Sequence, residues 1–258
     1  MQQKRPIHET AMPGMCATCP VRRLALFQPL RGEEITSTQQ CYRVDARCVE
    51  PGEAIYRQGD SSTEVYTLYE GWACLSQMTA EGERQILEFL LSGDFFGFQP
   101  GPCGEARIHS AHAITAASVC VFTCGGLWEM FREHIDLGMR LTRMTAHDEA
   151  MAYEHLVSIG RRSARERIAH LLLELFHRVR ARRPGPPDPV NKIDFPLTQE
   201  HIADACGLTN VHVNRTLMAL KNENLLAWKD KTLTIPDLDR LAAAANYSHD
   251  FVTNRLIL

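Results

Sequence analysis

Cys16 and Cys19 are the most closely spaced of the nine cysteines in this 258-residue sequence. A Cys-x-x-Cys spacing can bind a metal ion or an iron–sulfur cluster, or it can cycle between two thiols and a disulfide. The odd number of cysteines and the length of the chain argue against a secreted disulfide scaffold. We expect Cys74 and Cys206, which lie in apolar periodic runs, to be buried as small hydrophobic residues.

The segment from Leu197 to Leu217 carries residues that could read DNA bases. Thr198 and Thr209 can each cap a helix, and Gly207 can turn the chain between the two helices. This spacing predicts a helix-turn-helix whose second helix enters the major groove, where Arg pairs with guanine and Asn with adenine. The alternative is a helical pair that only packs. The predicted groove-facing residues are Asn210, Val211, His212, Asn214 and Arg215.

A wing is predicted directly after these helices. Residues 225–235 form two short apolar runs around the turn Lys229-Asp230-Lys231. Exposed lysines at such a turn contact phosphates, which adds affinity without sequence choice. We therefore expect Lys229 and Lys231 to bind the DNA backbone.

The predicted secondary structure before residue 197 changes once along the chain, from strands to helices. Short runs with strand character, separated by Gly- and Pro-containing turns, predict an antiparallel barrel or sandwich. From Leu127 the apolar period becomes helical and predicts one long helix, followed by a second helix over 164–180 and a Pro-rich loop. The predicted strands are 65–68, 72–78, 86–91, 110–115 and 119–122.

The long helix is expected to pair with its counterpart in a second copy of the chain. Asp148 and His155 fall on the predicted seam, where polar residues weaken a coiled coil but fix its register. The alternative is a single helix packed on its own barrel. The predicted dimer contacts are Leu141, Met144, Asp148, Ala152, Leu156 and Ile159.

Charge is divided unevenly along the chain. Residues 1–159 hold 13 Lys and Arg against 20 Asp and Glu, whereas residues 160–258 hold 15 against 11. The basic second part suggests contact with a polyanion, although two solvated surfaces would look the same. No apolar run approaches the roughly 18 residues of a membrane span, and the start lacks a signal peptide's apolar core. We expect a soluble, cytoplasmic protein with no membrane partner.

The order of these motifs resembles the CRP/FNR family of bacterial transcription regulators. Besides the helix-turn-helix, the matching pieces are Pro51-Gly52-Glu53, Gln58-Gly59-Asp60, Gly93–Gly97 and Ser163–Ile168. The resemblance implies an α+β fold: a cyclic-nucleotide-binding-type antiparallel β-barrel, a long dimerisation helix and a C-terminal winged helix-turn-helix. The implied domains are a Cys-containing leader (1–28), the barrel (29–134), the dimerisation helix (135–160) and the DNA-binding domain (161–258).

The resemblance also implies the partners. A homodimer would bind a palindromic site on double-stranded DNA with half-sites about one turn apart, and RNA polymerase would be a further partner. Arg215 matches the arginine that family members place on a guanine. Val211 stands where many members have a glutamate that accepts from cytosine, so the usual half-sites are in doubt.

The barrel departs from the effector sites of known members. Where cAMP-binding members have Glu and Arg-Ser, this chain has Asp94 and His109-Ser110, with Arg107 two residues away. A neutral His is a poor phosphate partner compared with a guanidinium. We expect Asp94, Arg107, His109 and Ser110 to line an effector pocket that does not bind cAMP. Gly97 and Gln99 replace the ligands of haem-binding members, so haem is not expected either.

Cysteines of the oxygen-sensing FNR branch are matched in part. Cys16, Cys19 and Cys120 match three thiolate ligands of its [4Fe–4S] cluster. Ala25 or Phe27 occupies the remaining position, so the Cys₄ set is one short. A fourth ligand could come from Cys124, Cys41, Cys48, His8 or a small molecule.

Two other interpretations of these thiols stay open. Cys16 and Cys19 could be a metal-free redox or persulfide switch, with Arg22 and Arg23 lowering the thiol pKa. They could also be idle cysteines in an unstructured leader.

The sequence therefore predicts a dimeric DNA-binding regulator that couples a redox, oxygen or nitric oxide signal to promoter binding. A regulator with a thiol switch or an unidentified small ligand, and no cluster, is the alternative. A barrel-only ligand-binding module does not account for the helix-turn-helix and wing. No enzyme is expected, because the chain has no phosphate-cradling Gly loop, HExxH motif or serine nucleophile elbow.

Overall fold

The computed structural model describes residues 16–37, 43–61, 63–99, 103–183 and 191–247. The chain divides into two compact units, residues 1–81 with 88–142 and residues 82–87 with 143–258. Two of the candidate fourth ligands, His8 and Cys41, lie outside the described residues.

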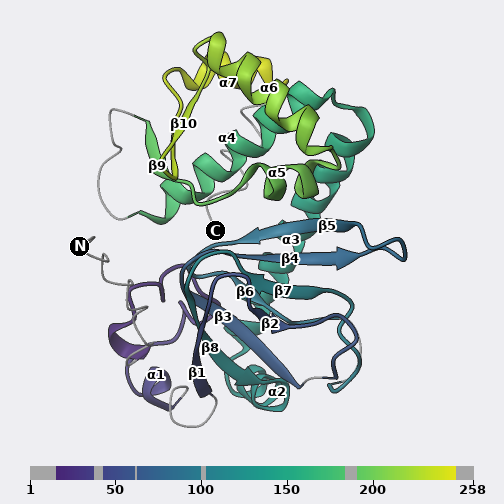
Figure 1. The fold of residues 1–258 in the computed structure, drawn as a ribbon. Helices are drawn as coiled ribbons and strands as arrows, with labels where there is room; N and C mark the ends of the chain where they lie inside the picture. Colours follow the sequence, from purple (N-terminus) through teal and green to yellow (C-terminus); the bar gives the residue numbers. More distant parts are fainter. Residues whose placement is uncertain (1–15, 38–42, 62, 100–102, 184–190, 248–258) are drawn as a thin grey trace, which may run out of the picture. The chain divides into compact units, whose positions relative to one another are not determined.

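Strands β1 to β8 form two antiparallel four-stranded sheets, with strand orders β1-β8-β3-β6 and β2-β7-β4-β5 (Figure 1), and all of these strands except residues 84–87 of β5 belong to the first unit. Among the described residues these strands form two sheets and not one closed barrel, and the edge strands β2 and β6 are only three and two residues long. All five predicted strands are present, and β1, β2 and β6 are additional. The strands are β1 (Arg43–Val49), β2 (Ala54–Tyr56), β3 (Glu64–Glu70), β4 (Ala73–Met78), β5 (Arg84–Leu90), β6 (Phe95–Phe96), β7 (Ser110–Ala113) and β8 (Ala117–Thr123).

The core of this unit lies between the two sheets and draws one face from each. Leu68 and Val119 come from the first sheet and Ala111 from the second, and all three are fully buried. Strand β8 is buried over six consecutive residues, so it is covered on both faces. Gly97 follows β6 with φ +83°, and a Cβ there would meet the Tyr66 ring at 2.9 Å, so only glycine fits this close approach.

Short helices flank the sheets. The 3-10 helix η1 (Cys16–Thr18) and α1 (Glu33–Ser37) precede β1, and α2 (Cys124–Glu133) directly follows β8. Thr123 caps α2, its hydroxyl accepting from the Gly126 amide at 3.0 Å. The long helix α3 (Ile135–Arg161) then begins after a single residue, His134.

The second unit packs helices around a buried central helix. Ser163 and Glu166 form a capping box at the start of α4 (Ala164–Arg182). The predicted apolar face of α4 is buried throughout, from Ile168 to Phe176. The other elements are β9 (Lys192–Asp194), α5 (Gln199–Cys206), α6 (Asn210–Asn222), β10 (Ala227–Lys229), β11 (Thr232–Thr234) and α7 (Leu238–Ala244).

His155, which the sequence places on the dimer seam, also contacts α4 of its own chain. Its ring turns toward α4, where Nε2 lies 2.8 Å from Oε2 of the buried Glu174. The same carboxylate pairs with Arg178 at 3.6 Å. A buried carboxylate needs such partners, and this requirement explains the orientation of His155.

Candidate nucleic-acid interface and thiol cavity

The helix-turn-helix forms where its capping residues predict. The Thr198 hydroxyl accepts from the His201 amide at 3.2 Å, and His201 Nδ1 accepts from the Thr198 amide at 3.1 Å. Gly207 ends α5 in the left-handed conformation, with φ +61° and ψ +46°. Thr209 then caps α6, accepting from the His212 amide at 3.3 Å. These contacts set the angle at which α6 leaves the turn.

Helix α6 has one buried face and one open face. Val213, Leu217 and Leu220 are fully buried against the unit. All five predicted groove-facing residues are exposed, and Val211 keeps 75% of its surface accessible. The residues at 210 and 214, and those at 211 and 215, are one turn apart and so are neighbours on the helix surface. The exposed residues are Asn210, Val211, His212, Asn214 and Arg215.

The helix pair also brings in a residue that the sequence did not single out. Asn214 Nδ2 donates to Gln199 Oε1 at 3.0 Å, joining the open face of α6 to the start of α5. Gln199 directly follows the cap Thr198. A polar amide side chain next to a predicted helix cap is the sequence signal that could have identified this residue. This hydrogen bond orients the Asn214 side chain.

The wing is a tight hairpin on a three-stranded sheet of order β10-β11-β9. Asp230 and Lys231 both have positive φ, 49° and 56°, as a two-residue primed turn requires. The Trp228 ring meets the Phe195 ring edge-on, with centroids 5.4 Å apart, and anchors the hairpin. Lys229 and Lys231 are both exposed, as a phosphate-contacting role requires. The third strand, β9, was not predicted, because its three residues carry no periodic signal.

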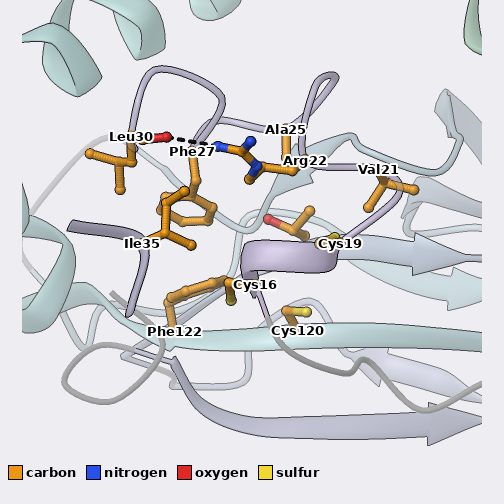
Figure 2. A pocket seen from close by; sticks show the side chains of 11 residues that line it. Cys16, Cys19, Val21, Arg22, Ala25, Phe27, Leu30, Ile35, Cys120 and Phe122 are labelled. Atoms are coloured by element: carbon orange, nitrogen blue, oxygen red, sulfur yellow. Dashed lines mark hydrogen bonds between the residues drawn. The ribbon is translucent and has the colours of Figure 1, made fainter. Parts of the chain in front are cut away.

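Cys16, Cys19 and Cys120 line one cavity in the first unit. Cys16 lies in η1 and Cys19 just after it, whereas Cys120 lies on β8, more than a hundred residues later (Figure 2). The cavity is partly open to solvent and spans about 460 Å³ of space not occupied by protein atoms, open solvent included. Its other lining residues are Val21, Arg22, Ala25, Phe27, Leu30, Ile35, Thr67 and Phe122.

The segment that carries the two N-terminal cysteines is fixed by side chains from elsewhere in the unit. The Phe27 ring packs on the Phe122 ring, with centroids 4.6 Å apart. Arg140 of α3 donates from Nε to the Ala25 carbonyl at 3.1 Å and from Nη1 to Gln28 Oε1 at 3.1 Å. The wall of the cavity is thus bonded directly to the long helix.

The expectation of a lowered thiol pKa through Arg22 and Arg23 is wrong for Cys16. Arg22 Nη1 donates to the Leu30 carbonyl at 2.7 Å (Figure 2). Burial raises the pKa of Cys16 and raises that of Cys120 to about 11, and the opposing cation is Arg43. The buried thiols are therefore held as neutral S–H groups at neutral pH, because desolvation outweighs the nearby charge.

The thiols do not complete a metal-binding set. Ala25 and Phe27, the two positions where a fourth ligand was sought, both line the cavity. Of the other candidates, Cys124 is bonded to Cys103 and Cys48 is exposed on β1. In the part of the chain that the structure describes, no three His, Cys, Asp or Glu side chains are grouped so as to hold a metal ion. The donor set as placed does not fit a four-thiolate cluster.

Arg107 fills part of the predicted effector pocket. This side chain is only 3% exposed, its guanidinium lies 4.4 Å from the centroid of the Tyr56 ring, and it donates to the Gly97 and Glu64 carbonyls. His109 Nδ1 lies 3.2 Å from the Tyr56 hydroxyl, and burial lowers the pKa of that imidazole. Stacked rings and an internally bonded guanidinium thus occupy this part of the sheet interior.

Two further residues of that pocket have structural partners. Ser110 Oγ accepts from the Gln58 amide at 2.9 Å. Asp94 Oδ2 accepts from the Leu91 amide at 2.8 Å, and Asp94 therefore stabilises the turn before β6. Its assignment to the effector pocket stays a prediction.

The long helix α3 exposes much of its predicted contact face. Leu156 is 70% exposed and Ile159 39%, and Asp148 and Ala152 are also exposed. Met144 is half-buried, and Leu141 is buried within its own chain. Large exposed apolar side chains in a row mark a surface suited to a second helix.

Comparisons with known proteins agree on the architecture. A cyclic nucleotide-binding domain model matches residues 46–134, and a Crp-like helix-turn-helix domain model matches residues 166–244. The chain is 31% identical over 236 residues to the transcriptional activator protein FnrL of Cereibacter sphaeroides, covering 91% of this chain and 93% of that protein. It is 30% identical over 230 residues to the nitrogen fixation regulation protein FixK of Bradyrhizobium diazoefficiens, covering 89% and 93%.

A solved structure gives the same result. The structure of FixK2 from Bradyrhizobium japonicum is similar with a TM-score of 0.69 at 26% identity, covering 78% of this chain and 96% of that one. Among the residues that the structure describes, none of the helices is both long and apolar enough to cross a membrane.

Proposed function

This chain belongs to the CRP/FNR family of bacterial transcription regulators, and we propose that it couples a redox, oxygen or nitric oxide signal to promoter binding through Cys16, Cys19 and Cys120. The protein is a DNA-binding regulator and not an enzyme. The proposal concerns what it senses and how the signal reaches the DNA.

One observation carries the proposal: three cysteines from distant parts of the sequence line a single cavity. Two of them belong to the segment whose Ala25 carbonyl accepts from Arg140 of α3. A change in the state of the thiols would move this segment, and the hydrogen bond would transmit the movement to the helix. A signal at the cavity therefore has a short physical route to the proposed dimer contact.

The proposed signal acts on the equilibrium between monomer and dimer, which a small free energy can shift. Asp148 lies on the exposed face of α3, where a charge at a helix–helix contact weakens the dimer. Allosteric signals are commonly worth about 1–3 kcal/mol, enough to move a marginal dimer between states. The dimer would then present two α6 helices to half-sites about one turn apart, with RNA polymerase as a further partner.

Two chemical forms of the sensor fit this proposal. In the first, a [4Fe–4S] cluster binds with a fourth ligand from beyond the described donors, and the bound cluster would supply lability toward oxygen or nitric oxide. In the second, no metal binds and the thiols themselves are oxidised or persulfidated. The common cavity of three thiols supports both forms, because the same three side chains would bind the cluster or be oxidised.

We do not propose cAMP or haem as effectors. The Arg107 guanidinium is engaged by the Gly97 and Glu64 carbonyls, and His109 is held beside Tyr56. Isothermal titration with cAMP should therefore give no binding heat. Saturable binding with a change in DNA affinity would contradict this part of the proposal.

The experiment is an iron and sulfide assay with an absorption spectrum on protein purified without oxygen. Brown protein that air bleaches assigns the first form, and Ala25→Cys should then raise the iron content by completing the thiolate set. Colourless protein after attempted cluster loading assigns the second form. Mass spectrometry should then show Cys16 and Cys19 oxidised together.

Matched variants test whether the response of DNA binding to the signal requires the thiols of this cavity. Cys120→Ala removes a lining thiol from β8, whereas Cys74→Ala removes a buried thiol from β4 in the opposite sheet. We expect the response of DNA binding to the signal to be lost in the first variant and kept in the second. Equal responses in both would refute the assignment of the sensor.

A further inference from the structure

We propose that Cys103 and Cys124 form a reversible redox pair, separate from the thiol cavity, whose oxidation ties residues 103–109, which precede β7, to the start of α2. The structure joins the two sulfurs in a disulfide across 21 residues, with Cα atoms 6.1 Å apart. A regulator of transcription works beside the chromosome, where reductants keep most thiols reduced and disulfides are usually transient. A disulfide under such reducing conditions is better explained as one state of a reversible thiol pair than as a permanent crosslink.

The two sulfurs have different surroundings. Cys124 is the first residue of the ten-residue helix α2, and its amide donates to the Thr63 carbonyl at 2.6 Å. The positive end of a helix stabilises a thiolate, so Cys124 is the nucleophile of the pair and also the better leaving group. Cys103 lies exposed in a turn, where a reductant can reach it.

Oxidation by a hydroperoxide follows from this asymmetry. The Cys124 thiolate attacks the terminal peroxide oxygen, the O–O bond breaks, and a sulfenic acid forms with release of an alcohol or water. The Cys103 thiol then attacks the Cys124 sulfur, the S–O bond breaks, and the hydroxyl leaves as water with the thiol proton. The two thiols lose two electrons, and the peroxide gains them.

Reduction begins at the Cys103 sulfur. A dithiol reductant attacks the exposed Cys103 sulfur, the S–S bond breaks, and Cys124 departs as the stabilised thiolate. The second thiol of the reductant then releases Cys103 and becomes a disulfide itself. Both directions are chemically balanced with reagents that reach an exposed site.

The disulfide adds a covalent attachment to a segment that is otherwise held by hydrogen bonds. The Ser61 hydroxyl donates to the Gly104 carbonyl, and the Arg107 amide donates to the Asp60 carbonyl at 2.8 Å. These contacts fasten the segment to the residues after β2. The bond to Cys124 instead fastens it to α2, which leads into α3 after one residue.

A tryptophan beside the pair provides a readout. Trp128 lines the same solvent-open hollow as Cys103 and Cys124. A disulfide close to an indole quenches its fluorescence. We therefore expect Trp128 emission to rise when the bond is reduced, and Trp128→Phe to abolish that rise.

The test uses the full-length chain carrying Cys16→Ser and Cys19→Ser, so that it is independent of the proposed sensor cavity. The protein is reduced with dithiothreitol, oxidised with hydrogen peroxide, and alkylated with iodoacetamide before mass spectrometry. We expect two cysteines, at 103 and 124, to lose alkylation on oxidation and regain it on reduction. Amide exchange over residues 103–108 should be slower in the oxidised protein.

Cys103→Ser should abolish the disulfide and the emission change, and should leave Cys124 as a sulfenic acid after peroxide treatment. Cys48→Ser, which removes an exposed cysteine of β1 in the same unit, should remove neither. Thiols that stay fully alkylated after peroxide treatment would overturn the proposal. So would a bond that resists excess dithiothreitol in the folded protein, because the disulfide would then be a permanent crosslink.

Discussion

Substitution of Glu174 by Gln tests the account of the α3–α4 contact most sharply. Glu174 is 2% exposed, and its two oxygens face His155 at 2.8 Å and Arg178 at 3.6 Å. Burial by itself raises the pKa of this carboxyl, but the charge and hydrogen bond of His155, with Arg178 and His170, bring it down to about 2. Glu174→Gln keeps the shape of the side chain and removes the charge.

The expected loss of stability follows from the difference between the pKa of this carboxyl in the unfolded and in the folded chain. A carboxyl whose pKa falls from 4.5 in the unfolded chain to about 2 in the folded one stabilises the fold by roughly 3 kcal/mol at neutral pH. At a urea m-value of about 2 kcal/mol per molar, the variant should unfold at a midpoint about 1.5 M lower. The amide can still accept from His155, so this figure is an upper bound.

The pH dependence has a definite sign. Because the folded-state pKa is lowered, the stabilisation is fully present above pH 4.5 and is lost as the pH falls toward 2. The difference between wild type and Glu174→Gln should therefore be constant from pH 7 to about 5 and shrink below that. A difference that grew on acidification would refute the reasoning.

The assay is urea unfolding followed through Trp228, whose ring packs on Phe195 in the same unit. Trp72→Phe and Trp128→Phe in the background restrict the signal to that unit. Glu223→Gln is the matched control, since it removes a carboxylate that pairs with Arg165 on the surface and should change the midpoint very little. Equal midpoints for Glu174→Gln and Glu223→Gln would show that the buried network does not stabilise the unit.

Three further predictions concern DNA binding and assembly. Arg215→Ala should raise the Kd for a selected palindrome about 10- to 100-fold, the size of a lost bidentate base contact, while leaving non-specific binding in place; a retained footprint would contradict this. Lys229→Ala should weaken binding to all sequences alike and reduce the slope of log K against log salt by about one per subunit, as measured by anisotropy titrations. Asp148→Ala should tighten the dimer and raise DNA binding without the signal; an unchanged sedimentation coefficient across concentrations would count against the seam.

The sequence predicted the second unit better than the first. Thr198, Gly207 and Thr209 act through local capping and turn chemistry, so their roles are readable from adjacent residues. The strands β1, β2 and β6 were missed because two of them are very short and their pairing is with strands distant in the sequence. Cys74 and Cys206, predicted as core residues, are both buried.

The thiol cavity was partly predictable. The resemblance to the FNR branch selected Cys16, Cys19 and Cys120, and the structure brings them to one cavity. The direction of the thiol pKa was not predictable, because it depends on burial in the folded chain and on Arg43, whereas Arg22 is hydrogen-bonded to the Leu30 carbonyl. The Cys103–Cys124 bond was missed for the same reason, since only tertiary structure brings those two residues together.

The central claim is that the cavity of Cys16, Cys19 and Cys120 controls DNA binding. The most direct measurement is the Kd for a selected palindrome, by fluorescence anisotropy, on anaerobically purified protein before and after exposure to oxygen or nitric oxide. We predict that the Kd changes in the wild type and in Cys74→Ala, and stays constant in Cys120→Ala. A Cys120→Ala variant that responds as the wild type does would contradict the account.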